Sequence, residues 1–267
     1  MAYQFLPSTP WLSEVTMKPF VFLLSLLLMA GCASTPVLRP PAVFSYDSGS
    51  RVGIVNLLPK TIKHYHIGTT IFNNFEKEYK VAWDFPGELN REFQDQCIAN
   101  GYQPVILDSS SLQLSPSDPL TVVEGDVAAV NPKVASLLQD LGEKHDLRLL
   151  FVVQPAEGRV YVPNAEIPVT GYGLATRNFL AVGSAKAFSM VDVTAISIRP
   201  LALTQGKRMR IIESISGLKL VGNFGEMSEN DLAAVKETLS APLKTFVADL
   251  LAKANVVKPG NAEPPSR

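Results

Sequence analysis

Leu147-Arg-Leu-Leu-Phe-Val-Val153 is apolar at every position except Arg148, and this stretch decides the fold class. Successive side chains of a β-strand point to opposite faces of the sheet. A strand that is apolar on both faces is therefore expected inside a sheet, where helices or loops cover both of its sides. The stretch predicts the central strand of an α/β domain.

The chain before this strand alternates between strand and helix patterns. Arg51–Leu58 is a short, mostly apolar run that predicts the first strand. Asp84-Phe-Pro-Gly predicts a helix start, because Asp is a frequent N-cap residue and Pro fits the first turn. The apolar face of this helix repeats every fourth residue, at Leu89, Phe93 and Cys97, and Gly101 stands where a C-cap glycine belongs.

A second helix is expected directly before the central strand. Asn131-Pro132 predicts its start, and its apolar stripe consists of Val134, Leu137, Leu138 and Leu141. Two further strands are expected between the helices, at Gln103–Leu107 and, as a short strand, at Leu120–Val123. The order of these elements predicts a β-α-β-α-β portion.

After the central strand the pattern becomes β-rich and is punctuated by glycine. Thr204-Gln-Gly-Lys207 lies between two such runs and predicts a hairpin turn. Ser228-Glu-Asn-Asp231 predicts a capping box for a C-terminal helix, which is interrupted near Pro242 and ends near Ala254. The segments expected as strands are 160–162, 167–172, 179–182, 187–203 and 209–217.

We therefore expect a single α/β (α+β) domain over residues 51–256. It should have a mixed sheet, flanking helices, an antiparallel hairpin extension and a C-terminal helix. Residues 32–50 are rich in Pro and Ser and predict a flexible tether, and residues 257–267 predict a disordered tail.

The N-terminal segment resembles the signal peptide and lipobox of a bacterial lipoprotein. Lys18 precedes an apolar run from Phe20 to Leu28, and Met29-Ala-Gly-Cys32 takes the place of the cleavage motif. The run is shorter than the about 20 residues that a membrane-spanning helix needs. The resemblance implies that residues 1–31 are removed and that Cys32 carries acyl chains such as palmitate.

Two further expectations concern this segment. Residues 1–16 contain two prolines, one glutamate and no Lys or Arg, so we expect translation to start at Met17. Ala33 follows the cysteine, where an aspartate would indicate retention in the inner membrane. The resemblance therefore implies a lipid anchor in the outer membrane, with the domain facing the periplasm.

The order of anchor, tether, first strand, helix and later hairpins resembles a group of periplasmic α/β proteins. These are the CsgG-type secretion lipoproteins, the lipoproteins that activate peptidoglycan synthases, and the N-terminal domain of TolB. Val52–Leu58 and the helix from Leu89 to Ile98 carry this likeness. This likeness is one of architecture and carries over no functional residue. Cys32 alone receives a role, and it does so from the likeness to the lipobox.

The composition argues against a nucleic-acid partner and against stabilisation by an intramolecular disulfide. The net charge of −1, with mixed signs, gives no electrostatic footprint for nucleic acid. With Cys32 taken by lipid, Cys97 has no partner for an intramolecular disulfide. We expect Cys97 to be a buried small apolar residue on its helix face.

His64-Tyr-His66 is the only histidine pair in the sequence. On a strand these two side chains share one face and could hold a metal, but neither Cys97 nor His145 is placed by sequence to supply the third ligand. We therefore expect no metal and no cofactor. Gly68–Phe75 mixes amides and hydroxyls with aromatics, which predicts either a hairpin with aromatics packed on the core or a binding loop.

The sequence leads to a functional hypothesis without a catalytic motif. We expect a non-enzymatic lipoprotein, held on the membrane through Cys32, that binds another envelope protein as a binding or assembly factor. A narrower alternative is a subunit of a secretion or surface-assembly complex. The rival from another class is a periplasmic hydrolase that uses His64, His66 or Glu213.

Overall fold

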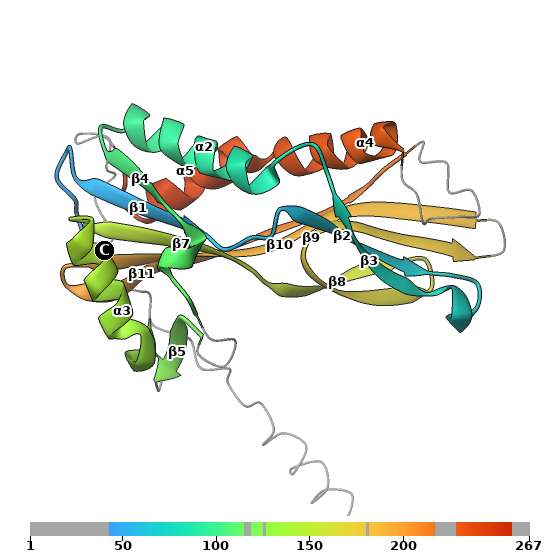
Figure 1. Cartoon of the computed structure of the whole chain (residues 1–267), viewed down its shortest axis with the longest axis horizontal. Helices are drawn as coiled ribbons and strands as arrows, with labels where there is room; N and C mark the ends of the chain where they lie inside the picture. The colour runs from blue at the N-terminus through green and yellow to red at the C-terminus, as the bar shows by residue number, and fades with distance from the viewer. Residues whose placement is uncertain (1–42, 115–118, 125–126, 180–181, 217–227, 258–267) are drawn as a thin grey trace, which may run out of the picture. The chain divides into compact units, whose positions relative to one another are not determined.

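The structure is a computed structural model, and it describes residues 43–114, 119–124, 127–179, 182–216 and 228–257 (Figure 1). All of them belong to the unit that spans Arg39–Arg267. The expected signal peptide and Cys32 lie outside the described residues, as does most of the expected tail.

The described residues form a mixed α/β domain around a nine-stranded sheet, as the sequence predicted. The strand order is β3-β2-β9-β10-β7-β1-β4, with β11 paired to β10 and β8 paired to β9. These strands are β1 (Arg51–Asn56), β2 (Thr61–Ile67), β3 (Phe75–Lys80), β4 (Gln103–Leu107), β7 (Leu149–Pro155), β8 (Glu157–Val162), β9 (Ala165–Phe179), β10 (Val182–Ile198) and β11 (Leu201–Ser214).

Helices cover both faces of this sheet, and a small second sheet is not hydrogen-bonded to it. In Figure 1, α2, α4 and α5 lie on one side of the sheet and α3 lies on the other. The helices are α2 (Phe85–Ala99), α3 (Pro132–Lys144), α4 (Glu229–Ser240) and α5 (Leu243–Lys253), with short 3-10 turns η1 (Ile71–Asn73) and η2 (Ser109–Ser111). The second sheet pairs β5 (Thr121–Glu124) with β6 (Val127–Val130). No helix in the described part of the chain is long and apolar enough to cross a membrane.

The central strand is the one that the sequence predicted. β7 lies between β1, to which it is parallel, and β10, to which it is antiparallel. Leu149, Phe151 and Val153 face the main apolar cluster, which includes α2 and α5, while Leu150 and Val152 face a second cluster that includes α3. All five side chains are buried, because each face of the strand has its own helical layer.

β10 joins the α/β part of the sheet to an antiparallel extension. One edge of β10 is shared: Val191–Ser197 pairs with β7, and Val182–Met190 pairs with β9. β7 and β9 meet along this edge of β10. There the Ala156 N–H donates to the Met190 carbonyl (2.9 Å) and the Gly171 N–H donates to the Ala156 carbonyl (3.1 Å). We call β2, β3, β8, β9 and the Val182–Met190 half of β10 the arm.

The predicted boundaries within the extension were wrong in two places. Segments 167–172 and 179–182 were expected as separate strands, but β9 is one strand that ends at Phe179, where β10 follows after a short connection. Gly171 and Gly173 have φ of 76° and 152°, so the strand bends at these residues without ending.

The hairpin turn expected at Thr204–Lys207 was also wrong. These residues lie inside β11, and the chain turns at Arg199-Pro200. The Thr204 hydroxyl donates to the Ala195 carbonyl (2.9 Å), beside a register shift between Ala195 and Ile196. The glycine at 206 therefore accompanies an irregular stretch of a paired strand, which the sequence pattern cannot distinguish from a turn.

The end of the expected tether contacts the domain. The Phe44 carbonyl accepts from the Asn255 side chain (3.1 Å), and the Tyr46 carbonyl accepts from the Tyr102 hydroxyl (3.3 Å). Gly49 N–H donates to the Gly101 carbonyl (2.8 Å). These contacts bring the chain that leads toward Cys32 to the C-terminal ends of α2 and α5.

Candidate functional site

The arm places the histidine pair on a buried face. β2 lies between β3 and β9, with His64 opposite Lys77 and His66 opposite Phe75 on β3. The two histidine side chains share one face, as their spacing predicted, and they are 0% and 5% exposed. The sequence thus correctly predicted how they are oriented relative to each other.

One hydroxyl group connects the two imidazole rings. Thr176 Oγ1 on β9 lies 2.7 Å from His64 Nε2 and 2.7 Å from His66 Nδ1. A hydroxyl can donate one hydrogen bond and accept another, so it can bond to both rings when they are neutral and in complementary tautomers. The Tyr79 hydroxyl lies 3.3 Å from His64 Nδ1, and the Phe75 ring stacks on His66 at 4.9 Å between ring centroids.

Burial holds both histidines in the neutral form. Desolvation, together with repulsion from His66 and Lys77, lowers the pKa of His64 to about 3. Desolvation lowers the pKa of His66 to about 4. Both rings are therefore uncharged at neutral pH, and their polar atoms are engaged within the arm. This arrangement suits a structural cluster better than a general base, which needs a pKa near the working pH.

Within the part of the chain that the structure describes, no third metal ligand joins the histidine pair. Among the described residues, no three His, Cys, Asp or Glu side chains are grouped as a metal site requires. Cys97 is buried under α2 in the main cluster, where desolvation raises the pKa of its thiol to about 12. His145 is the C-cap residue of α3, outside the arm.

The hydrolase hypothesis named His64, His66 or Glu213 as its catalytic group, and the sheet keeps Glu213 away from the two histidines. Glu213 on β11 is opposite Ala187, which is opposite Leu174, which is opposite His64. Three strand spacings lie between them, about 14 Å of backbone separation. Glu213 is exposed on its strand, so no pair of groups for acid–base chemistry forms between Glu213 and His64.

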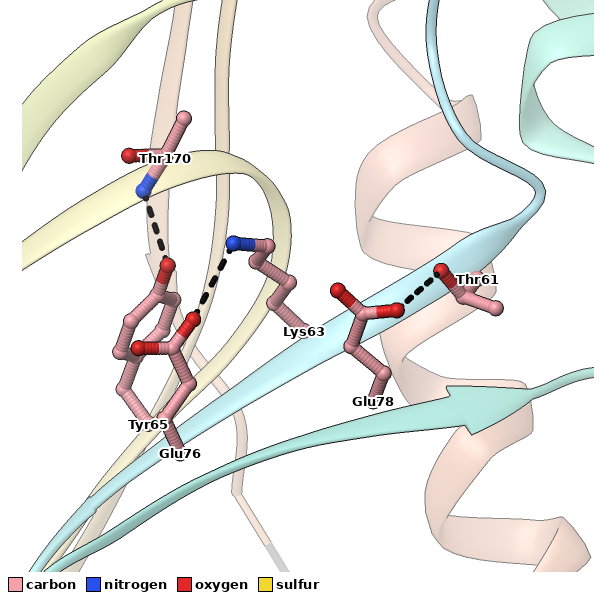
Figure 2. A network of polar contacts seen from close by, with 6 residues as sticks. All are labelled: Thr61, Lys63, Tyr65, Glu76, Glu78 and Thr170. Carbon is pink, nitrogen blue, oxygen red and sulfur yellow. Dashed lines mark hydrogen bonds and ion pairs between the residues drawn. The ribbon is translucent and has the colours of Figure 1, made fainter.

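The opposite face of β2 carries a polar network (Figure 2). Lys63 Nζ lies 3.1 Å from Glu76 Oε1, and Thr61 Oγ1 donates to Glu78 Oε2 (3.1 Å). The Tyr65 hydroxyl accepts from the Thr170 N–H (3.2 Å). A groove of about 650 Å³ runs beside this network and is lined by residues of β2, β3, β8 and β9. The contacts join β2 to β3 and to β9 on this face of the arm.

The β8–β9 hairpin packs against the same face and forms a small core of its own. Its buried members are Ala156, Val160, Val162, Ile167, Val169, Ala175, Phe188 and Met190, and Tyr65 and Ile67 pack against them. The arm therefore has buried side chains on both faces. The loop at the end of the arm is therefore attached to strands that are packed on both faces.

The loop between β2 and β3, residues 68–74, exposes two large apolar side chains, and we call it the arm tip. Ile71 is 77% exposed and Phe72 is 93% exposed. Both belong to the 3-10 turn η1, in which the Asn73 N–H donates to the Thr70 carbonyl (3.0 Å). Of the two alternatives expected for this segment, the packed hairpin describes Phe75, which stacks on His66, but not Phe72, which is exposed.

Polar side chains hold the arm tip in shape. Asn74 Oδ1 accepts from the Gly68 N–H (2.9 Å), and Thr69 Oγ1 donates to the Asn178 carbonyl on β9 (3.2 Å). Gly68 approaches Asn73 so closely that a Cβ atom at position 68 would collide with the Asn73 Cβ. The amides and hydroxyls that marked this segment in the sequence are thus used to build the loop that exposes Ile71 and Phe72.

Comparisons with known proteins add only distant structural likenesses. No family model matches the chain, and no curated protein matches it by sequence. A Xanthomonas campestris protein of the family model DUF330 is similar with a TM-score of 0.40 and 7% identity, over 81% of this chain and 91% of that chain.

Two further solved structures are similar at the same distant level. A hypothetical protein of Chlamydia trachomatis has a TM-score of 0.35 and 10% identity, over 78% of this chain and 98% of that chain. PelC of Paraburkholderia phytofirmans, described as a dodecamer, has a TM-score of 0.32 and 8% identity, over 83% and 98%. At these values the likenesses carry no argument about function.

Proposed function

We propose that this chain is a lipid-anchored protein of the outer membrane that acts in the periplasm as a non-catalytic binding or assembly factor. The arm tip is its contact surface. The observation that carries the proposal is the exposure of Ile71 and Phe72 on a loop that specific hydrogen bonds hold in place. Large apolar side chains held in water cost solvation free energy, and their presentation on a built loop is typical of a binding element.

The lipid on Cys32 would supply the second part of the mechanism. An acylated chain is confined to a membrane surface, so any partner at that surface meets the arm tip at a raised effective concentration. The likeness in element order to CsgG-type lipoproteins makes a secretion or surface-assembly complex the first kind of partner to test.

The anchor is tested by metabolic labelling. We expect labelled palmitate to be incorporated into the full chain and to be absent from the Cys32→Ser variant. The Cys97→Ser variant is the matched control, because its thiol is buried in the main cluster, and it should label like the unsubstituted chain. Equal labelling of the Cys32→Ser variant would contradict the assignment of the acylated residue.

The contact surface is tested by complementation of a strain that lacks the protein. We expect the double variant Ile71→Ser, Phe72→Ser to be folded and membrane-bound but to lose complementation. Ile98→Ser is the control, since Ile98 is 62% exposed on α2, outside the arm. Full activity of the arm-tip variant would remove the tip from the proposal.

The same assay separates this function from hydrolysis. We expect Glu213→Gln to complement fully, because this carboxylate is exposed and remote from the histidine pair. A complete loss with Glu213→Gln, in a chain that is folded and membrane-bound, would favour the hydrolase.

A further inference from the structure

We infer that the arm tip inserts into the interfacial region of a phospholipid bilayer, so that the chain touches the membrane at a site distinct from its acylated N-terminus. This inference deepens the proposed function, on which it rests for the presence of a membrane beside the arm. It names the partner of the arm tip as a lipid surface.

The apolar surface of the arm tip is small and narrow, because it consists of two side chains on one short loop. Ile71 and Phe72 are held at the end of the arm by the Gly68–Asn74 and Thr69–Asn178 hydrogen bonds. β2 and β9 are parallel, with Ile67 opposite Arg177, so the β2–β3 loop lies at the same end of the sheet as the end of β9 (Figure 1). Two side chains cannot supply the about 800 Å² that each partner contributes to a typical stable protein interface. A small apolar surface of this kind suits a fluid lipid layer, because lipid molecules can rearrange around the two side chains.

The loop at this end of the arm carries no charged side chain. From Ile67 to Phe75 the sequence has no charged residue, and the polar side chains there are Thr and Asn. The neighbouring strand ends, Asn178–Phe179 of β9 and Val182–Ala185 of β10, are also free of charged residues, and Arg177 beside them is buried. An apolar centre with uncharged hydrogen-bonding groups around it suits the boundary between lipid headgroups and acyl chains.

A group of charged residues follows the tip on β3. Glu76, Lys77 and Glu78 of β3 are exposed directly after Phe75, and Lys77 Nζ lies 5.0 Å from the centre of the Phe75 ring. Charged side chains are costly in the hydrocarbon region, so insertion would stop at the headgroups. The geometry limits the contact to the loop and keeps the rest of the arm in water.

The test uses the full chain with Phe72→Trp, reconstituted with vesicles of phosphatidylethanolamine and phosphatidylglycerol. Lipids brominated on their acyl chains quench tryptophan that enters the bilayer. We expect the quenching at position 72 to be at least about twofold stronger than at position 98 in the matched control Ile98→Trp, because interfacial segments bury their apolar groups about 5–10 Å deep. The unsubstituted chain gives the background of Trp83, since Trp11 precedes the expected start at Met17.

Three results would overturn the inference. Equal quenching at positions 72 and 98 would show that the tip stays in water. Protection of position 72 from aqueous acrylamide that grows with protein concentration, without quenching by brominated lipid, would assign the tip to a second copy of the chain. The same protection on addition of envelope protein extract would assign it to a protein partner.

Failure of the inference is distinguishable from failure of the proposed anchor. The quenching measurement is repeated with Cys32→Ser in the same full chain. If palmitate labelling fails but position 72 is still quenched, the anchor is wrong and the tip contact stands. If palmitate is incorporated and position 72 is not quenched, the anchor stands and the tip contact is wrong. Ile71→Trp repeats the measurement at the neighbouring exposed position.

Discussion

At the scale of single residues, the histidine pair shows what burial does to a polar motif. The spacing in His64-Tyr-His66 correctly predicted that both rings lie on one face of a strand. Thr176, which comes more than a hundred positions later in the sequence, supplies the hydroxyl that bonds to both rings. The pair that suggested a metal site is thus a hydrogen-bonded link between β2 and β9.

The lowered pKa values of His64 and His66 predict a specific pH dependence of stability. Above the ordinary pKa of about 6.5, both rings are neutral in the folded and the unfolded chain. As the pH falls from there toward 4 and then 3, the unfolded chain binds protons that the folded chain does not, so folding loses stability. Each histidine contributes a slope of up to about 1.4 kcal/mol per pH unit in this window.

Denaturant unfolding of the full chain between pH 7 and pH 4 measures this slope. We expect His64→Gln and His66→Gln each to reduce it. His145→Gln at the end of α3 is the control for removal of a histidine outside the arm. An unchanged slope in both arm variants would show that other groups cause any acid sensitivity.

At the scale of elements, the helix starts follow from local chemistry. Asp84 caps α2 by accepting from the Gly87 N–H (3.1 Å), and Ser228 and Asp231 form the reciprocal capping box of α4. Both starts were predicted, because a cap depends on residues within one turn of each other. The predicted break near Pro242 is the junction between α4 and α5.

The cap of α2 gives a prediction at this scale. We expect Asp84→Ala to lower the free energy of unfolding by about 1 kcal/mol, because the first-turn N–H groups lose their side-chain acceptor. Asp95→Ala is the matched control on the exposed face of the same helix and should have a much smaller effect. Equal losses in the two variants, measured by denaturant unfolding, would contradict a role for the cap.

At the scale of the whole domain, stability is divided between the α/β part and the arm. Phe151 on β7 packs in the main cluster with Phe93 of α2, at 5.2 Å between ring centroids. Phe188 on β10 packs in the separate cluster under the β8–β9 hairpin. β10 runs through both regions, so it connects a core covered by helices to one formed between strands.

This division predicts different effects for two similar core truncations. We expect Phe151→Ala to lower the global free energy of unfolding by about 3–5 kcal/mol and to speed amide hydrogen exchange throughout the domain. Phe188→Ala should speed exchange first in β8, β9 and β2, because the buried members of its cluster lie mainly in the β8–β9 hairpin and Tyr65 of β2 contacts its ring. The same exchange pattern in both variants would show that the domain unfolds as one unit.

The expected lipid anchor and the proposed partner depend on different kinds of information. The assignment of Cys32 rests on the order of charge, apolar run and small residues, which is a linear signal, and it stays a prediction. Ile71 and Phe72 belong to a segment that the sequence marked as unusual, for which a hairpin with packed aromatics and a binding loop were both expected as alternatives. Composition alone could not separate Phe75, which stacks on His66, from Phe72, which is exposed.

The sequence by itself determined the elements whose signals are local: the buried central strand, the capped helices and the shared face of the two histidines. Only the tertiary structure decided that β9 bends and continues, that Thr176 bonds to both rings, and that Glu213 lies three strands from His64. Caps and periodicities act over a few residues, so they are readable along the chain. Register, strand neighbours and exposure depend on which distant segments pack together, because pairing energy is shared among residues that the sequence holds far apart.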